Sequence, residues 1–244
     1  DDTTSVTVAA GTNAAADVNT GNLTGTDSLT SFTMTSSTAG SVGTVGTIAD
    51  ADALTDLSIT ANYGNLTVGN IGASGSAENL ASVTVSADNG ATATLGGTIT
   101  ADTTDSASDL AMTVTSTAET SSTVALGTVT NTFGTITGTF GGAGTTDSTA
   151  LTADDVTLTI NSGGGTHAAI TATDDVVMTV ANTAATAVTS LDFGATTAGS
   201  ADITLTGSST FGLATIVASA GTLTVDGSGA SGAITVGNTA NNMT

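Results

Sequence analysis

Short runs in which apolar residues alternate with threonine recur along the whole chain. They are Val6-Thr7-Val8, Phe32-Thr33-Met34, Val83-Thr84-Val85, Met112-Thr113-Val114, Leu158-Thr159-Ile160, Ile203-Thr204-Leu205 and Leu223-Thr224-Val225. Alternation with period two places the apolar side chains on one face of a strand and threonine on the other. Clusters of Gly, Ser, Asn and Asp between the runs are typical of turns. The pattern therefore predicts a series of short, half-buried strands.

The same composition disfavours helices. The chain has no Lys, Arg or Gln and only two Glu, and about a quarter of its residues are β-branched Thr. We expect helix in less than about 10% of the chain. The inward positions are predicted to include Val156, Leu158, Ile160, Val176, Met178, Val180, Ile203, Leu205, Leu223 and Val225, with Thr157, Thr159 and Thr179 facing out.

The strands also repeat in register. Residues 154–161 are followed twenty residues later by a close copy at 174–181, and looser copies begin at Asp56, Asp109 and Asp202. Units of about 18–27 residues with short strands are typical of a stacked β-solenoid, in which neighbouring coils supply the core that one coil lacks. We expect a single repetitive β domain over residues 1–244, with its weakest boundary at 101–109, where the repeat loses register.

A β-sandwich, or two of them, is the competing architecture, because regularly spaced short strands fit it too. Sandwiches normally carry large aromatic anchors and edge prolines, whereas this chain has no Trp, no Pro and a single Tyr, Tyr63. This difference favours the all-β, β-helix-like solenoid. Four of the five Phe precede glycine and are predicted to be core residues that close a strand: Phe133, Phe140, Phe193 and Phe211.

The charge of the chain excludes several partners. It carries 21 acidic residues and no Lys or Arg, so its formal net charge is −21. Nucleic acids and anionic membrane surfaces are bound through basic residues, and no apolar run reaches the roughly 18 residues of a membrane span. We therefore expect no nucleic-acid partner and no membrane insertion. Such acidity suits surroundings rich in divalent cations, which indicates an extracellular location.

The residues needed for catalysis are scarce. The only histidine, His167, lies in a Gly-rich stretch and is predicted to be an exposed residue of a turn or of a strand start, without a triad around it. Glu78 and Glu119 lie in polar contexts without the aromatic platforms of sugar sites. The Gly-rich stretch 138–144 has no Lys and so is not a phosphate loop. The chain is predicted not to be an enzyme.

Clusters of aspartate are the residues of this chain with the chemistry of a possible metal site. If residues 154–155 and 174–175 stack on adjacent coils, their carboxylates lie about 4.8 Å apart and repel one another, with no basic residue to relieve them. Ca²⁺ binds six to eight oxygens of the kind that such turns offer. The predicted calcium ligands form three groups: Asp154, Asp155, Asp174 and Asp175; Asp50, Asp52 and Asp56; and Asp102, Asp105 and Asp109. Solvated turn acids remain the alternative at each site.

Two short motifs resemble those of a known class. Gly141-Gly142-Ala143-Gly144-Thr145-Thr146-Asp147 resembles the glycine-aspartate nonapeptide of calcium-binding repeats-in-toxin proteins, and residues 234–242 resemble the lead-in to such repeats. The overall composition is similar to that of bacterial surface-layer proteins and of repetitive adhesins that leave the cell by type I secretion. The resemblance implies a secreted, self-associating, calcium-dependent β-solenoid at the cell surface, and adds Asp147 to the candidate ligands.

These observations lead to one functional expectation and two alternatives. We expect a structural subunit of an extracellular lattice or filament, such as a surface layer or sheath, whose partners are identical copies. A cell-surface polysaccharide is a further candidate partner. The main alternative is a repetitive adhesin segment that acts as a spacer or binds a ligand. Ice binding by a flat threonine array is the least favoured alternative.

Overall fold

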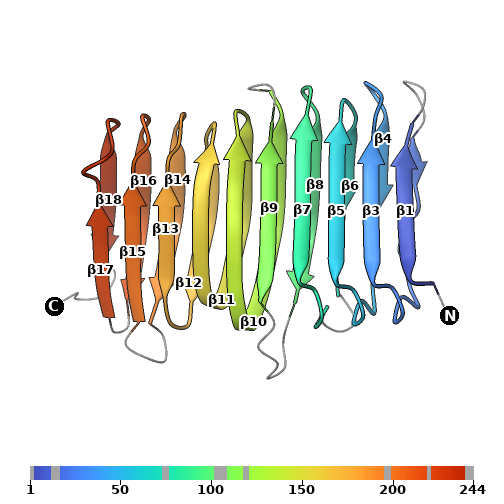
Figure 1. Ribbon diagram of the computed structural model, residues 1–244, viewed down its shortest axis with the longest axis horizontal. Helices are drawn as coiled ribbons and strands as arrows, with labels where there is room; N and C mark the ends of the chain where they lie inside the picture. The colour runs from blue at the N-terminus through green and yellow to red at the C-terminus, as the bar shows by residue number, and fades with distance from the viewer. Residues whose placement is uncertain are drawn as a thin grey trace.

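The computed structural model describes residues 3–11, 17–72, 77–101, 109–117, 121–194, 199–218 and 221–239. In these residues the chain forms an all-β solenoid of parallel strands, with about 25 residues per turn and no helix (Figure 1). The predicted solenoid is confirmed, since the strands pair in parallel and do not form a sandwich of antiparallel sheets. The part of the chain described here also has no helix long and apolar enough to span a membrane.

The strands are β1 (Ser5–Ala10), β2 (Val18–Asn19), β3 (Ser31–Ser36), β4 (Val42–Val45), β5 (Asp56–Asn62), β6 (Asn65–Val68), β7 (Ser82–Asp88), β8 (Thr92–Thr100), β9 (Leu110–Ser116), β10 (Thr123–Gly142), β11 (Thr145–Ser162), β12 (Gly165–Ala172), β13 (Val176–Val180), β14 (Thr186–Phe193), β15 (Gly199–Leu205), β16 (Phe211–Ala218), β17 (Gly221–Asp226) and β18 (Ile234–Thr239).

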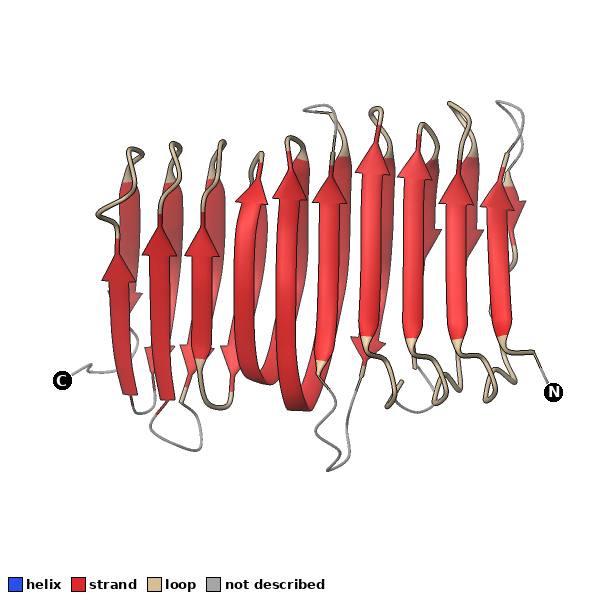
Figure 2. Ribbon diagram, viewed as in Figure 1, coloured by secondary structure: helices blue, strands red, loops and turns tan. Residues whose placement is uncertain are grey.

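Each coil contributes one strand to each of two facing layers. We call β1, β3, β5, β7, β9, β13, β15 and β17, with the second halves of β10 and β11, the front sheet, and the remaining strands the back sheet. β10 and β11 bend around the lower corner and so run through both sheets (Figure 2). Every pairing between coils is parallel, as in β1 with β3 and β3 with β5.

The core consists of inward rows that run the length of the stack. One row of the front sheet is Val6, Phe32, Leu57, Val83, Met112, Gly138, Leu158, Met178, Ile203 and Val225, each paired with the next. Eight of the ten predicted core residues are buried. The other two, Leu223 and Val225, are only partly buried because they lie in β17, in the last described coil. Thr157, Thr159 and Thr179 lie on the outward face as predicted.

The coils vary in length more than the repeat predicted. Thr139 pairs with Thr159, a step of 20 residues, whereas Thr84 pairs with Thr113, a step of 29. The range of 18–27 was therefore too narrow, because corners differ in length. The earlier coils carry an extra row of parallel bridges through Leu23, Ile48, Ile71 and Ile99. β7 pairs directly with β9, so the ladder continues on both sides of residues 102–108, which lie outside the described ranges.

Two of the looser copies were aligned wrongly. Asp109 falls in the row of Asp155, because Thr135 pairs with Asp155 and Ile136 pairs with Leu110. Asp56 and Asp202 instead fall in the outward row that contains Thr157, two residues further along the strand. Corner length decides this register, and the alternation of the strands alone does not reveal it.

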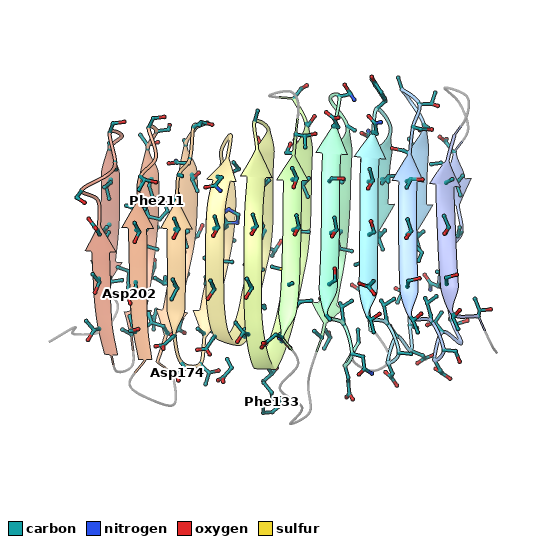
Figure 3. All side chains as sticks on the ribbon, in the orientation of Figure 1. Phe133, Asp174, Asp202 and Phe211 are labelled. Atoms are coloured by element: carbon teal, nitrogen blue, oxygen red, sulfur yellow. The ribbon has the colours of Figure 1, made fainter. Side chains whose placement is uncertain are left out.

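The four Phe-Gly pairs do not behave alike. Phe140, Phe193 and Phe211 are buried, but Phe211 opens β16 instead of closing a strand. The prediction is wrong for Phe133, which is 47% exposed at the lower corner, where the pairing of β10 shifts register (Figure 3). Gly138 makes room for the neighbouring ring: a Cβ there would lie 3.1 Å from Phe140 and 2.8 Å from Leu158.

Candidate functional site

A column of carboxylates lies where the front strands begin. The Oδ1 atom of Asp109 accepts the backbone N–H of Thr135 on the next coil (3.2 Å). Asp155 accepts a hydrogen bond from the backbone N–H of Asp175 (3.0 Å), and Asp175 accepts one from the backbone N–H of Ser200 (2.5 Å). Hydrogen bonds from backbone N–H groups stabilise an ionised carboxylate. Each of these aspartates therefore fastens its own coil to the following one, an arrangement that we call a corner cap.

Corner caps occur at other corners too, and asparagine serves as well as aspartate. The further examples are Asp17 to Val42 (3.2 Å), Asn22 to Thr47 (2.9 Å), Asn65 to Thr92 (2.9 Å), Asn70 to Thr98 (2.8 Å) and Asp147 to Thr166 (2.7 Å). In every case the side chain reaches toward the next coil along the chain. The sequence analysis missed this role. The available signal was that Asn22 and Asn70 each directly precede a residue of the recurring row Leu23, Ile48, Ile71 and Ile99.

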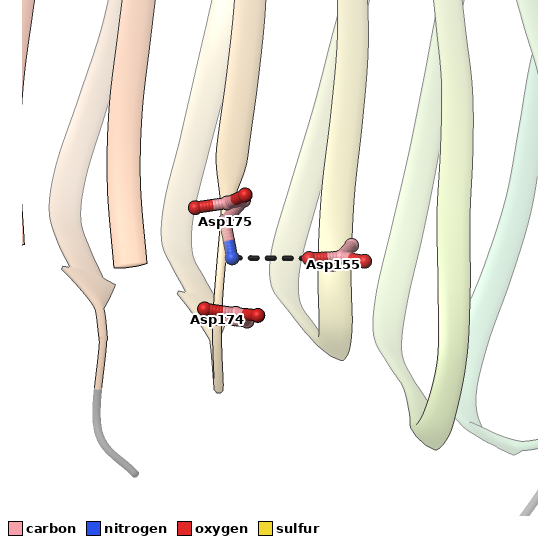
Figure 4. A group of neighbouring side chains, drawn as sticks. All are labelled: Asp155, Asp174 and Asp175. Atoms are coloured by element: carbon pink, nitrogen blue, oxygen red, sulfur yellow. Dashed lines mark hydrogen bonds between the residues drawn. The ribbon is translucent and has the colours of Figure 1, made fainter. Parts of the chain in front are cut away.

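One acidic group in the described ranges is arranged to hold a metal ion. Asp155, Asp174 and Asp175 each offer a carboxylate oxygen, and these atoms all lie within 4.8 Å of one another (Figure 4). The neighbouring Asp154 has its pKa raised, first by burial and then by the negative charges of Asp155 and Asp174. Asp154 therefore lies near enough to Asp155 and Asp174 to feel their charges. The three aspartates could therefore bind a cation.

The other predicted ligands lie elsewhere. Asp50 and Asp52 lie in a lower corner, and Asp56 accepts a hydrogen bond from the hydroxyl of Thr55 (2.7 Å). Within the part of the chain that the structure describes, these three do not form a second cluster with the geometry of a metal site. Asp109 and Asp147 both serve as corner caps. Asp102, Asp105 and Glu119 fall outside the described residues.

His167 was predicted to be an exposed residue of a turn or of a strand start; it lies near the start of β12, but the predicted exposure is wrong. It is fully buried in an inward row of the back sheet, between Ser148 and Val188. Its Nδ1 lies 2.9 Å from the Ser148 hydroxyl, and its ring packs edge-on against Phe140 with centroids 4.7 Å apart. Among the described residues Nε2 has no hydrogen-bond partner, and burial lowers the pKa of His167 to about 4. The Ser–His pair faces the core, where a substrate has no access.

A signal for the inward position of His167 was present in the sequence. His167 precedes Ile170 by three residues, as Val188 precedes Leu191 and Leu213 precedes Ile216. All of these residues are buried. The spacing of three differs from strict alternation because these back strands carry two consecutive, less buried residues between the inward ones. The Gly-rich residues before His167 had suggested a turn instead.

The back sheet also has shallow grooves. One of about 450 Å³ is lined by Asp147, Thr166, Ala187, Gly212 and Thr235 among others, and one of about 190 Å³ lies beside it. Both arise where small side chains interrupt the outward row.

The comparisons with known proteins give no family assignment. No protein family model matches the chain, and neither the curated proteins nor the solved structures gave a significant match. The proposals below therefore rest on the fold, the charge and the geometry of this chain.

Proposed function

We propose that this protein is a structural subunit of an extracellular lattice or filament, such as a surface layer or sheath, and that its partners are identical copies. The observation that carries the proposal is that the edge of one coil is complementary to another coil of the same chain. From β1 to β18, coil after coil is joined by parallel pairing, with apolar rows inside and polar rows outside.

The last described coil has apolar residues that are exposed at its edge. Ile234 and Val236 in β18 are 38% and 42% exposed, whereas Leu213, the partner of Val236 one coil earlier, is 1% exposed. Unpaired parallel edges with apolar residues are typical sites of strand addition. A second copy that added its first coil by the same pairing would cover these residues. The adhesin spacer has the same fold but remains a single chain.

Self-association is tested with the purified chain at micromolar concentration in calcium, by sedimentation and electron microscopy. We expect ordered fibres or sheets. The variant Val236→Asp places a charge on the exposed coil edge and should weaken association at least tenfold, since the added coil would cover that charge without a partner for it. Val42→Asp is a control of equal exposure, because Val42 is 41% exposed but faces outward on β4, which is paired with β2 on one side and β6 on the other. A monodisperse single chain at these concentrations would contradict the proposal and favour the spacer.

We further propose that calcium is the cation at Asp155, Asp174 and Asp175. Backbone N–H groups satisfy one oxygen of Asp155 and one of Asp175, and each carboxylate has a second oxygen. Calcium prefers carboxylate and carbonyl oxygens and accepts irregular geometry. The chain has no Lys or Arg that could neutralise the group instead.

Chelation should therefore lower the melting temperature. A cation that binds only the folded state adds about 4 kcal/mol at a thousandfold excess over its dissociation constant, which corresponds to about 10 °C for a chain of this length. Asp155→Asn with Asp175→Asn keeps an oxygen for each corner cap but removes two charges, so the calcium response should largely disappear. Asp155→Ala with Asp175→Ala also loses the caps and should melt lower still.

The control is Asp56→Asn with Asp202→Asn, which removes the same charge away from the cluster and should keep the response. Melting is followed by circular dichroism with calcium, with chelator, and with sodium at equal ionic strength. Equal melting temperatures in calcium and chelator would show that the cluster binds no calcium, and an equal loss of response in the control would show that only total charge matters.

A further inference from the structure

The front sheet presents a regular, nearly uncharged outer face. Its middle outward row consists of Thr7, Thr33, Ser58, Thr84, Thr113, Thr139, Thr159, Thr179, Thr204 and Asp226. Hydroxyl residues thus occupy nine consecutive coils before the first charge. Figure 3 shows these side chains in level rows across the front strands. From β7 to β13 the outward rows on either side, from Ser82 to Val177, are uncharged as well.

The back sheet provides an internal comparison. Its corresponding outward row is Thr44, Thr67, Thr94, Ala125, Asp147, Thr166, Ala187, Gly212 and Thr235. This row is broken by small residues and a charge, has grooves, and lies in strands that shift register near Leu126. Both sheets meet the same demand for β-forming residues on the outside. Strand propensity alone therefore does not explain the continuous row of the front sheet.

The charge of the chain makes the front face suited to another copy. A molecule with a net charge of −21 repels its own copies, and two carboxylates at 4 Å cost about 1 kcal/mol in water and about 4 kcal/mol at an effective dielectric of 20. The cluster of Asp155, Asp174 and Asp175 lies at the lower corner (Figure 4), and Asp155 and Asp175 precede Thr159 and Thr179 of the middle row by four residues. Along the middle row from β1 to β15 two copies can approach without bringing carboxylates together, whereas Asp56 and Asp202 lie in the outward row below it.

The size of the face fits a stable contact. Nine strands spaced about 4.8 Å apart extend about 40 Å, and three outward residues along each strand cover about 17 Å. The product is about 700 Å² on each copy, close to the roughly 800 Å² of a standard protein interface. Asp56 and Asp202 lie in the lower row of this area, on either side of the uncharged strands β7 to β13. Val177, 44% exposed on this face, adds apolar surface to the threonine methyl groups.

We propose that the front face binds the front face of a second copy, related by a two-fold axis, as the lateral contact of the assembly. This inference rests on the proposed function, in which identical copies are the partners. Coil stacking at the ends extends a filament in one direction, and a two-fold contact through the front face would join two such filaments side by side. Threonine hydroxyls in this contact donate to and accept from those of the other copy.

The test compares two double variants with matched exposure on adjacent strands. Thr84→Asp with Thr113→Asp places charges on the front row, and Thr67→Asp with Thr94→Asp places them on the back row; each pair has one exposed and one half-buried position. Association is measured by sedimentation and electron microscopy in calcium, and folding is checked by melting. We expect the front variant to lose lateral association by at least a hundredfold while end-to-end filaments persist, and the back variant to assemble as the wild type does.

A charge-reversed partner distinguishes a face contact from poor folding. Thr84→Lys with Thr113→Lys, mixed in equal amounts with the front aspartate variant, should restore lateral association, because opposite charges then meet across the contact. Wild-type association unchanged in the front variant would overturn the inference and leave the proposed function intact. A wild type that stays a single chain would overturn both. Loss of ice or polysaccharide binding in the front variant, with association unaffected, would assign the face to that other occupant and overturn the inference.

Discussion

Phe193→Ala is expected to lower the free energy of unfolding by about 3–5 kcal/mol. The ring is fully buried at the end of β14, and its removal leaves a cavity that flanking coils can fill only by shifting paired strands. For a chain of this length the change corresponds to a melting temperature about 10 °C lower. Urea unfolding followed by circular dichroism measures the difference.

Phe133→Ala is the matched control, since the sequence places both residues directly before glycine. Phe133 is 47% exposed, and its loss should change the free energy of unfolding by less than about 0.5 kcal/mol. Because stacked coils can unfold in segments, the unfolding slope is compared as well as the midpoint. Equal effects of the two substitutions would contradict the packing described for the lower corner of β10.

Acidification should destabilise the solenoid through His167. Its pKa is lowered by burial to about 4 in the folded state, against an unperturbed value of 6.5. As the pH falls, the unfolded chain thus binds the proton first. The contribution of His167 to the free energy of unfolding is fully present above about pH 6.5 and is lost as the pH falls toward 4. A shift of this size corresponds to about 3 kcal/mol. The groups packed against the ring, Ser148 and Phe140, carry no charge that could offset the imidazolium.

The double variant His167→Leu with Ser148→Ala isolates this contribution, since it removes the imidazole together with the hydroxyl that would otherwise lose its partner. Relative to the wild type, its free energy of unfolding should rise by about 3 kcal/mol between pH 7 and pH 4, because only the wild type loses stability when the imidazole is protonated. The raised pKa of Asp154 acts in the opposite direction, because protonation as the pH falls removes a charge that burial disfavours first and the charges of Asp155 and Asp174 disfavour second. Asp154→Asn is therefore the control for the acidic corner. A difference between wild type and double variant that does not change with pH would show that His167 is not buried as a neutral group.

The local properties of the strands could be predicted from the sequence. Val156, Leu158 and Ile160 face inward and Thr157 and Thr159 outward because period-two alternation is a property of the extended backbone itself. The absence of helix follows equally from local preferences, since Thr is abundant and strong helix formers are scarce. The stacking of Asp155 with Asp175 could be predicted because two adjacent coils have the same length of 20 residues.

Only the tertiary structure decided what depends on contacts between coils. The exposure of Phe133, the contact of His167 with Ser148, the register of Asp56 and Asp202, and the partners of the corner caps all follow from how one coil lies on the next. Corner length sets that register, and a change of one residue at a corner moves side chains between the inward and outward faces. Local sequence therefore determined which segments are strands and which of their residues are apolar. The pairing of coils decided which polar groups meet, because the register of that pairing depends on the lengths of corners that are distant in the chain.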